Sequence, residues 1–144
     1  MGGYPGGTTM RLTDEQLSEY RELKDSDVDV SDEHVLAPHS GEETSVHYHA
    51  KACVAHIAKE NGYVANCECG VNGKYDIDVL IWGHPERLSY AVEIEHNPTQ
   101  EVKESKLNRY VTHTAVDELC LINANELPMN VLEMHDAIEA ALGL

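Results

Sequence analysis

Residues 74–97, KYDIDVLIWGHPERLSYAVEIEHN, contain two runs in which apolar and polar residues alternate on either side of a Gly-His-Pro turn. Strict alternation in runs rich in β-branched residues is typical of half-buried strands. The apolar sets are Ile77, Val79 and Ile81 in the first run, and Tyr90, Val92 and Ile94 in the second. We therefore predict a β-hairpin over this stretch, with both apolar sets on one face.

The length of the turn sets the register of this hairpin. A loop of about six residues places Asp78 opposite Glu93 and Asp76 opposite Glu95. Four carboxylates then converge on one face, and like charges directly opposite one another are destabilising. Because carboxylate oxygens are ligands of divalent cations, we expect a cation there. The alternative is a solvated polar face in an acid-rich protein, since a one-sided hairpin normally faces water.

The segments around the hairpin predict a single α/β domain over residues 40–144. The expected order is helix, three strands, helix, strand, helix: a helix from the capping box at 40–43 to Asn61, strands over 63–69 and the hairpin, a helix over about 100–113, a strand over 118–124 and a last helix after Pro128. Residues 1–39 are expected to be an acidic, partly disordered segment with one short helix after Thr13, followed by a solvated linker, DSDVDVSDEH, over 25–34.

The first helix of this domain has an apolar stripe that should pack on the sheet. Its members are spaced four, three and four residues apart, as one helix face requires: Val46, Ala50, Cys53 and Ile57. His49 lies off the stripe, whereas His47 and Lys51 lie beside it, one turn apart.

Asp78 before Val79-Leu80-Ile81, followed by Glu93-x-Glu95 on the next strand, resembles the PD-(D/E)xK, or restriction-endonuclease-like, nuclease superfamily. The resemblance extends over roughly residues 40–127 and is strengthened by the order of elements. It implies an αβββαβ core, in which a mixed four-stranded sheet is flanked by helices. It also implies a metal-dependent DNA endonuclease.

The same resemblance implies roles for individual residues. Asp78, Glu93 and Glu95 would be the catalytic residues, and Asp78, Glu93 and Glu43 would hold Mg²⁺ or Mn²⁺. Glu95 stands where the family usually has lysine, so the positive charge would have to come from elsewhere, with Lys103 or Lys106 on the next helix as candidates.

Basic residues near this site are the candidates for contact with DNA. Lys51 follows His47 in a spacing that resembles the opening of competence-type nucleases, and Lys103, Lys106 and Arg109 cluster on the later helix beside Tyr110. Two simpler interpretations stay open: ordinary helix polarity for Lys51, and pairing with surface acids for the cluster.

The charge of the chain is strongly unbalanced, with 26 acidic against 10 basic residues and a formal net charge of −16. We favour adaptation to high salt, and hence a halophilic archaeon or its mobile element as the source. The alternative is an acidic interaction protein that repels nucleic acid. No signal peptide or membrane-length apolar run is evident, so we expect a cytoplasmic protein with no membrane partner.

Four cysteines are few for a disulfide framework and are expected to be reduced. Cys67-x-Cys69 with His47 or His49 could bind zinc, but the one-residue gap favours packed thiols.

Taken together, the residues predict a metal-dependent DNA endonuclease that acts alone, as a homodimer or within a larger DNA-processing complex. The rival interpretation is a non-catalytic module that keeps the fold and assists a plasmid, viral or conjugative DNA-processing complex. A third is an acidic protein-binding domain with no link to nucleic acid.

Overall fold

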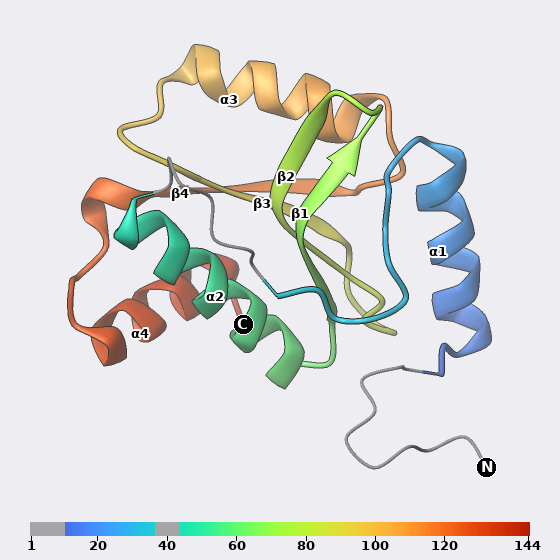
Figure 1. Ribbon diagram of the computed structural model, residues 1–144, viewed down its shortest axis with the longest axis horizontal. Coiled ribbons are helices and arrows are strands. Elements are labelled where there is room, and N and C mark those ends of the chain that lie inside the picture. Colours follow the sequence, from blue (N-terminus) through green and yellow to red (C-terminus); the bar gives the residue numbers. More distant parts are fainter. Residues whose placement is uncertain (1–10, 37–43) are drawn as a thin grey trace.

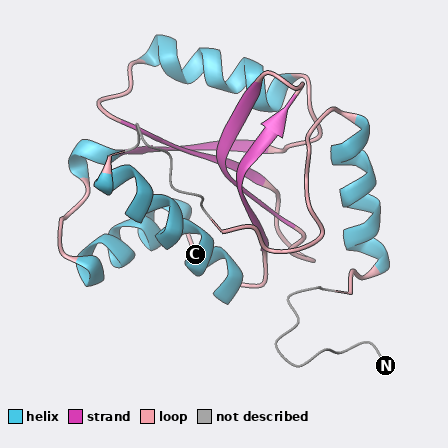
Figure 2. Cartoon of the chain, in the orientation of Figure 1, coloured by secondary structure: helices cyan, strands magenta, loops and turns pink. Residues whose placement is uncertain are grey.

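A computed structural model of the chain, which describes residues 11–36 and 44–144, has a four-stranded sheet at its centre (Figures 1 and 2). The strands lie side by side in chain order: β1 (Val64–Val71), β2 (Tyr75–Trp82), β3 (Tyr90–Glu95) and β4 (Glu118–Asn123). The first three are antiparallel, whereas β4 runs parallel to β3. The predicted mixed sheet is therefore confirmed.

Helices lie on both sides of this sheet (Figure 1). Their bounds are α1 (Asp14–Asp25), α2 (Ser45–Glu60), α3 (Gln100–Leu107) and α4 (Val131–Leu142). From α2 to α4 the chain follows the predicted order of helix, three strands, helix, strand, helix. No helix within the two described ranges is long and apolar enough to cross a membrane.

Both faces of the sheet are buried, which corrects the prediction of one apolar face. Val79, Ile81 and Val92 face a core shared with α2 and α4. Leu80 and Ala91, which alternate with them, are buried in a second core on the opposite face, and so is Ile77, which was predicted to share the face of Val79 and Ile81. Helices on both sides exclude water from both sets of side chains, so the alternation did not separate an inner from an outer face.

The segment after α1 also belongs to the second core, so its interpretation as a solvated linker is wrong. Val28 and Val30 are each 1% exposed and pack with Leu23 of α1. Val28 also forms an antiparallel bridge to Val71 of β1. Acids alternate with valines here, and only the valines point into the core, as in a half-buried edge strand.

Helix α2 begins slightly later than predicted. Thr44 is its N-cap, and its hydroxyl accepts a hydrogen bond from the His47 backbone at 3.1 Å. The capping box predicted at 40–43 lies outside the described residues. Ala50 and Ile57 of the expected stripe are fully buried, but Val46 and Cys53 are only half-buried, and the buried face also includes Lys51, Val54, Ala55 and Ala58.

The helix after β3 is capped by Thr99, as predicted, but it changes character before its end. It is α-helical to Leu107 and then forms a turn of π-helix over Asn108–Thr112. A π-turn carries one extra residue per turn, so it shifts the side chains that follow it around the helix axis. Tyr110 is thereby buried in the second core.

Candidate active site

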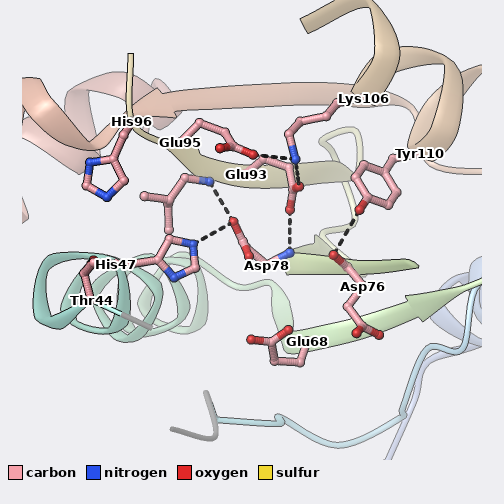
Figure 3. A pocket seen from close by; sticks show the side chains of 11 residues that line it. Thr44, His47, Glu68, Asp76, Asp78, Glu93, Glu95, His96, Lys106 and Tyr110 are labelled. Carbon is pink, nitrogen blue, oxygen red and sulfur yellow. Dashed lines mark hydrogen bonds and ion pairs between the residues drawn. The ribbon is translucent and has the colours of Figure 1, made fainter. Parts of the chain in front are cut away.

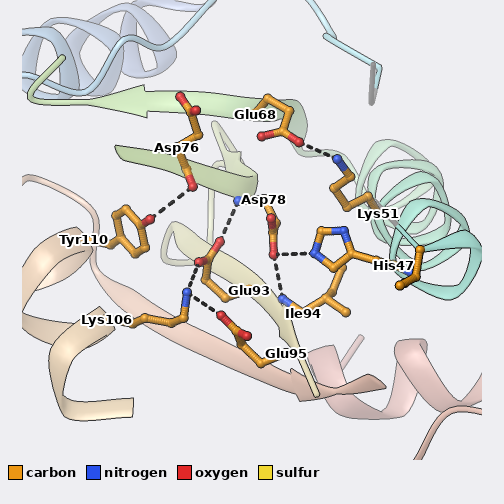
Figure 4. A network of polar contacts seen from close by, with 11 residues as sticks. His47, Lys51, Glu68, Asp76, Asp78, Glu93, Ile94, Glu95, Lys106 and Tyr110 are labelled. Carbon is orange, nitrogen blue, oxygen red and sulfur yellow. Dashed lines mark hydrogen bonds and ion pairs between the residues drawn. The ribbon is translucent and has the colours of Figure 1, made fainter. Parts of the chain in front are cut away.

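The pairing of β2 with β3 changes at Asp78 and Glu93. Backbone pairing runs from Ile81↔Tyr90 to Val79↔Val92, and the same register places Asp78 opposite Glu93, as predicted. At this point side chains replace backbone partners: the Glu93 carboxylate accepts from the Asp78 N–H at 2.6 Å, and the Asp78 carboxylate accepts from the Ile94 N–H at 2.8 Å (Figure 4). Each acid is thus fixed by the opposite strand.

A cleft of about 390 Å³ opens beside these two acids (Figure 3). We call it the acidic cleft; it is lined by Thr44, His47, Glu68, Asp76, Asp78, Glu93, Ile94, Glu95, His96, Lys106 and Tyr110. The four carboxylates that the hairpin register predicted therefore line one cleft. Asp76 is the most peripheral: its side chain is exposed, and its backbone carbonyl accepts a hydrogen bond from the Tyr110 hydroxyl at 3.1 Å.

Lys106 reaches the cleft from α3. Its ammonium lies 2.7 Å from a carboxylate oxygen of Glu93 and 2.7 Å from one of Glu95 (Figure 4). Lys106 was a candidate for the positive charge missing at position 95, and the structure brings it to the acids. Lys103, the other candidate, is exposed on α3 and does not line the cleft.

Burial dominates the electrostatics of this group. Glu93 is 2% exposed, and burial together with the negative charge of Asp78 raises its pKa to about 7, although Lys106 partly offsets this rise. Burial lowers the pKa of Lys106, but attraction to Glu93 and Glu95 outweighs burial and raises that pKa above its ordinary value. Lys106 therefore stays charged, while Glu93 keeps its proton to a higher pH than an ordinary glutamate does.

On the other side of the cleft, α2 contributes His47. Its Nε2 lies 3.2 Å from the Asp78 carboxylate, which also binds the Ile94 N–H (Figure 4). The same carboxylate is thus held by β3 and by α2. Because His47 occupies the first turn of α2, its position depends on the cap at Thr44.

The prediction that Lys51 contacts nucleic acid does not fit the structure. Its side chain is fully buried, and its ammonium forms an ion pair with Glu68 of β1 at 2.5 Å (Figure 4). Lysine at a buried helix position normally needs such a partner, because burying an unpaired charge is costly. Glu68 itself lines the cleft.

Glu68 was missed by the sequence analysis, although a signal for it existed. Cys67 pairs with Val79 and Cys69 with Ile77, so Glu68 falls opposite Asp78. The tight turn at Asn72 and Gly73, both with positive φ, sets this register. Glu68 also has a positive φ of 50°.

The cysteines on either side of Glu68 lie in different cores. Cys67 packs with α2 and α4, whereas Cys69 packs on the opposite face, and both are buried. Burial and the nearby charge of Asp29 raise the pKa of Cys69 to about 12. Two thiols on opposite faces of a sheet cannot share one zinc ion, so packed thiols are the correct interpretation.

Two candidates from the sequence remain, Glu43 and Arg109. Glu43, the predicted third metal ligand, lies outside the described residues. Arg109 does not line the cleft; its guanidinium stacks on the ring of Tyr75, 3.9 Å from the centroid.

The cleft carboxylates are held by protein groups rather than gathered around one point. Within residues 11–36 and 44–144, the group whose three ligand atoms all lie within 4.8 Å of one another is His135, Asp136 and Glu139 on α4. None of these lines the cleft. A cation in the cleft would therefore have to compete with Lys106 for Glu93.

No protein-family model, curated protein or solved structure matches this chain.

Proposed function

We propose that the chain is a metal-dependent DNA endonuclease that hydrolyses phosphodiester bonds in the acidic cleft. The observation that supports this most is the position of Lys106, whose ammonium lies 2.7 Å from both Glu93 and Glu95. Lys106 of α3 thus brings a positive charge to the acids. Residue 95 on β3, where the resembling family usually has lysine, is glutamate in this chain. A buried carboxylate, Glu93, beside the half-buried carboxylate of Asp78 and a lysine in an open cleft form a set of groups suited to phosphate chemistry.

The residues present fit Mg²⁺ or Mn²⁺. Asp78 and Glu93 offer carboxylate oxygens, which these hard cations prefer. The raised pKa of Glu93 indicates that its charge is poorly compensated by Lys106 alone, and a divalent cation would compensate it. When bound, such an ion would polarise the phosphodiester and lower the pKa of its bound water.

Other side chains of the cleft would have supporting roles. Glu95 holds the Lys106 ammonium, which can orient a water molecule or neutralise charge on phosphate. His47 and the Ile94 N–H hold the carboxylate of Asp78. Each of these contacts joins two different helices or strands, so the cleft forms only in the folded chain.

The net charge of −16 would repel DNA at low ionic strength. At multimolar salt the Debye length falls to about 3 Å or less, which removes most of this repulsion. The proposal therefore includes a halophilic source and an enzyme that acts at high salt.

One observation favours the rival, a non-catalytic nuclease-fold module that assists DNA processing. Lys106 already forms ion pairs with both Glu93 and Glu95, as a structural substitute for a metal would. In the nuclease Lys106 acts on the substrate, whereas in the non-catalytic module it only pairs with the two acids.

A matched pair of variants on α3 tests this difference. Wild type, Lys106→Met and Lys103→Met would be incubated with Mn²⁺ and linear, supercoiled and branched DNA in molar KCl. Both variants remove one lysine charge from the same helix, but only Lys106 reaches the acids. We expect Lys106→Met to lose about 10²-fold or more of the cleavage rate, and Lys103→Met to stay within about twofold. Equal rates for Lys106→Met and wild type would contradict the role of Lys106. A wild type that binds Mn²⁺ but cleaves none of the substrates would favour the rival.

A further inference from the structure

A second groove, of about 450 Å³, lies beside α3 and the β1–β2 turn. We call it the stacking groove; its walls include Asn72, Tyr75, Ser105, Asn108, Arg109 and His113. One helical segment separates it from the acidic cleft, since Lys106 and Tyr110 line the cleft while Ser105 and Arg109 line the groove.

The central feature of the groove is the contact between Arg109 and Tyr75. The guanidinium carbon lies 3.9 Å from the centroid of the Tyr75 ring, and Tyr75 is 38% exposed. In a chain with 26 acids, no carboxylate of the described residues lies within 4.0 Å of Arg109. Arg109 is thus positioned by aromatic rings rather than by an ion pair, which leaves its charge available to a ligand.

Arg109 lies in the π-turn over Asn108–Thr112. π-Turns are rare and are frequently found at functional sites. This one contains Tyr110, which has two cations near its ring: Lys106 Nζ and Arg109 Cζ lie 5.8 Å and 5.6 Å from the ring centroid. The two charges are therefore within about 11 Å of each other. Along one DNA strand there is a phosphate about every 3.4 Å of helix axis, so a single strand can contact both.

From this geometry we infer that the stacking groove binds an unpaired nucleotide next to the phosphodiester held in the cleft, with its base stacked on the Arg109–Tyr75 pair. The inference rests on the proposed function for the path of the strand. A base within a duplex is covered on both faces, so only an unpaired base can stack on a protein ring. The substrate class is then single-stranded DNA, or branched DNA with an unpaired end.

The high salt concentration at which the protein is proposed to act also favours a single-stranded substrate. Contacts to phosphate weaken steeply as salt concentration rises, because counterions are no longer released favourably. A strongly acidic protein at high salt gains little from them. Stacking on a tyrosine and a guanidinium depends much less on ionic strength, and the amides of Asn72 and Asn108 can add neutral hydrogen bonds.

The test measures binding without cleavage. A fluorescent 12-nucleotide oligothymidine and a duplex of equal length would be titrated with the 144-residue chain in EDTA, over a series of KCl concentrations, with anisotropy as the readout. We expect the single strand to bind more tightly than the duplex, and its affinity not to fall as KCl rises toward molar concentrations. Tyr75→Leu and Arg109→Met should each weaken binding by about 5- to 150-fold, since stacking contributes about 1–3 kcal/mol per base.

Two further variants separate the stack from other effects. Tyr75→Phe keeps the ring and should bind within about twofold of wild type, which distinguishes lost stacking from lost folding. Arg21→Met removes an equal charge from the exposed face of α1 and should also bind within about twofold. Equal affinity for single strand and duplex, or wild-type affinity in Tyr75→Leu, would overturn the inference.

This outcome is independent of catalysis. If binding requires the Tyr75 ring but the protein cleaves nothing with Mn²⁺, the stacking groove is supported and the nuclease is rejected. If the protein cleaves DNA but its binding does not depend on Tyr75 or Arg109, the nuclease is supported and the stacking groove is rejected.

Discussion

The two ends of the β2–β3 pair share one register but differ in everything else. At one end, Val79 and Ile81 pair with Val92 and Tyr90, and helices cover both faces. At the other end, Asp78 and Glu93 exchange side-chain hydrogen bonds with the opposite backbone and border a cleft. The apolar end gains stability from every buried methyl group, whereas the polar end must offset the burial of charge.

The polar end offsets that cost only in part. Two backbone N–H groups and the Lys106 ammonium contact the carboxylates, yet the pKa of Glu93 still rises to about 7. A structural polar network would be fully compensated, because unpaired buried charge is destabilising. Incomplete compensation is what we expect of a site that gives up stability for binding or catalysis.

The largest effect is expected at the apolar end. Ile57→Ala should lower the free energy of unfolding by about 2–5 kcal/mol, because Ile57 is fully buried in the core that contains Val79 and Val92. His49→Ala, on the exposed side of the same helix, should cost well under 1 kcal/mol. Urea unfolding of both variants is the measurement. Equal costs would mean that α2 packs through another face.

At the polar end we expect a smaller change in the free energy of unfolding, and a substitution there should stabilise the fold rather than destabilise it. A carboxyl group whose pKa is raised on folding stabilises the fold most at low pH. Its contribution is lost as pH rises from its unfolded pKa, near 4.5, through about 7. Because glutamine does not titrate, Glu93→Gln should not lose stability in this way as pH rises. Its stability relative to wild type should therefore increase between pH 4.5 and 7.5, by at most about 3 kcal/mol.

Thermal and urea melts at several pH values measure this difference. Glu101→Gln, which neutralises an exposed acid in the first turn of α3, is the matched control and should show no comparable dependence. A Glu93→Gln variant that becomes less stable than wild type as pH rises would identify the polar end as a structural network.

Local pattern was enough to predict the central features of this comparison. Alternation located both strands, and the assumption of a loop of about six residues gave the register that places Asp78 opposite Glu93. Register follows from chain geometry over a short stretch, so a sequence can reveal it. The order of helices and strands followed in the same way from capping residues and hydrophobic period.

Features that depend on distant parts of the chain were not predicted. The burial of Val28 and Val30 depends on β1, which begins more than 30 residues later. Lys51 was expected at the surface because lysine usually is, but its burial with Glu68 depends on how α2 packs on β1. Lys106 was one of two equal candidates, and only the packing of α3 distinguishes it from Lys103.

The smallest change in stability should come from Asp78→Asn in the absence of metal. An asparagine keeps an oxygen that can accept the Ile94 N–H and removes a charge close to Glu93, so we expect a change below about 1 kcal/mol. Mn²⁺ should then separate the proteins: wild type gains about 2.7 kcal/mol at a hundred times the Kd, and Asp78→Asn gains nothing. Asp136→Asn is the control, because it disrupts the group on α4 whose ligand atoms already lie close together. If Asp136→Asn instead removes the response to Mn²⁺ and Asp78→Asn keeps it, the ion binds on α4. The polar end of the β2–β3 pair would then be an ordinary ion-pair network, and the proposed nuclease would lose its metal site.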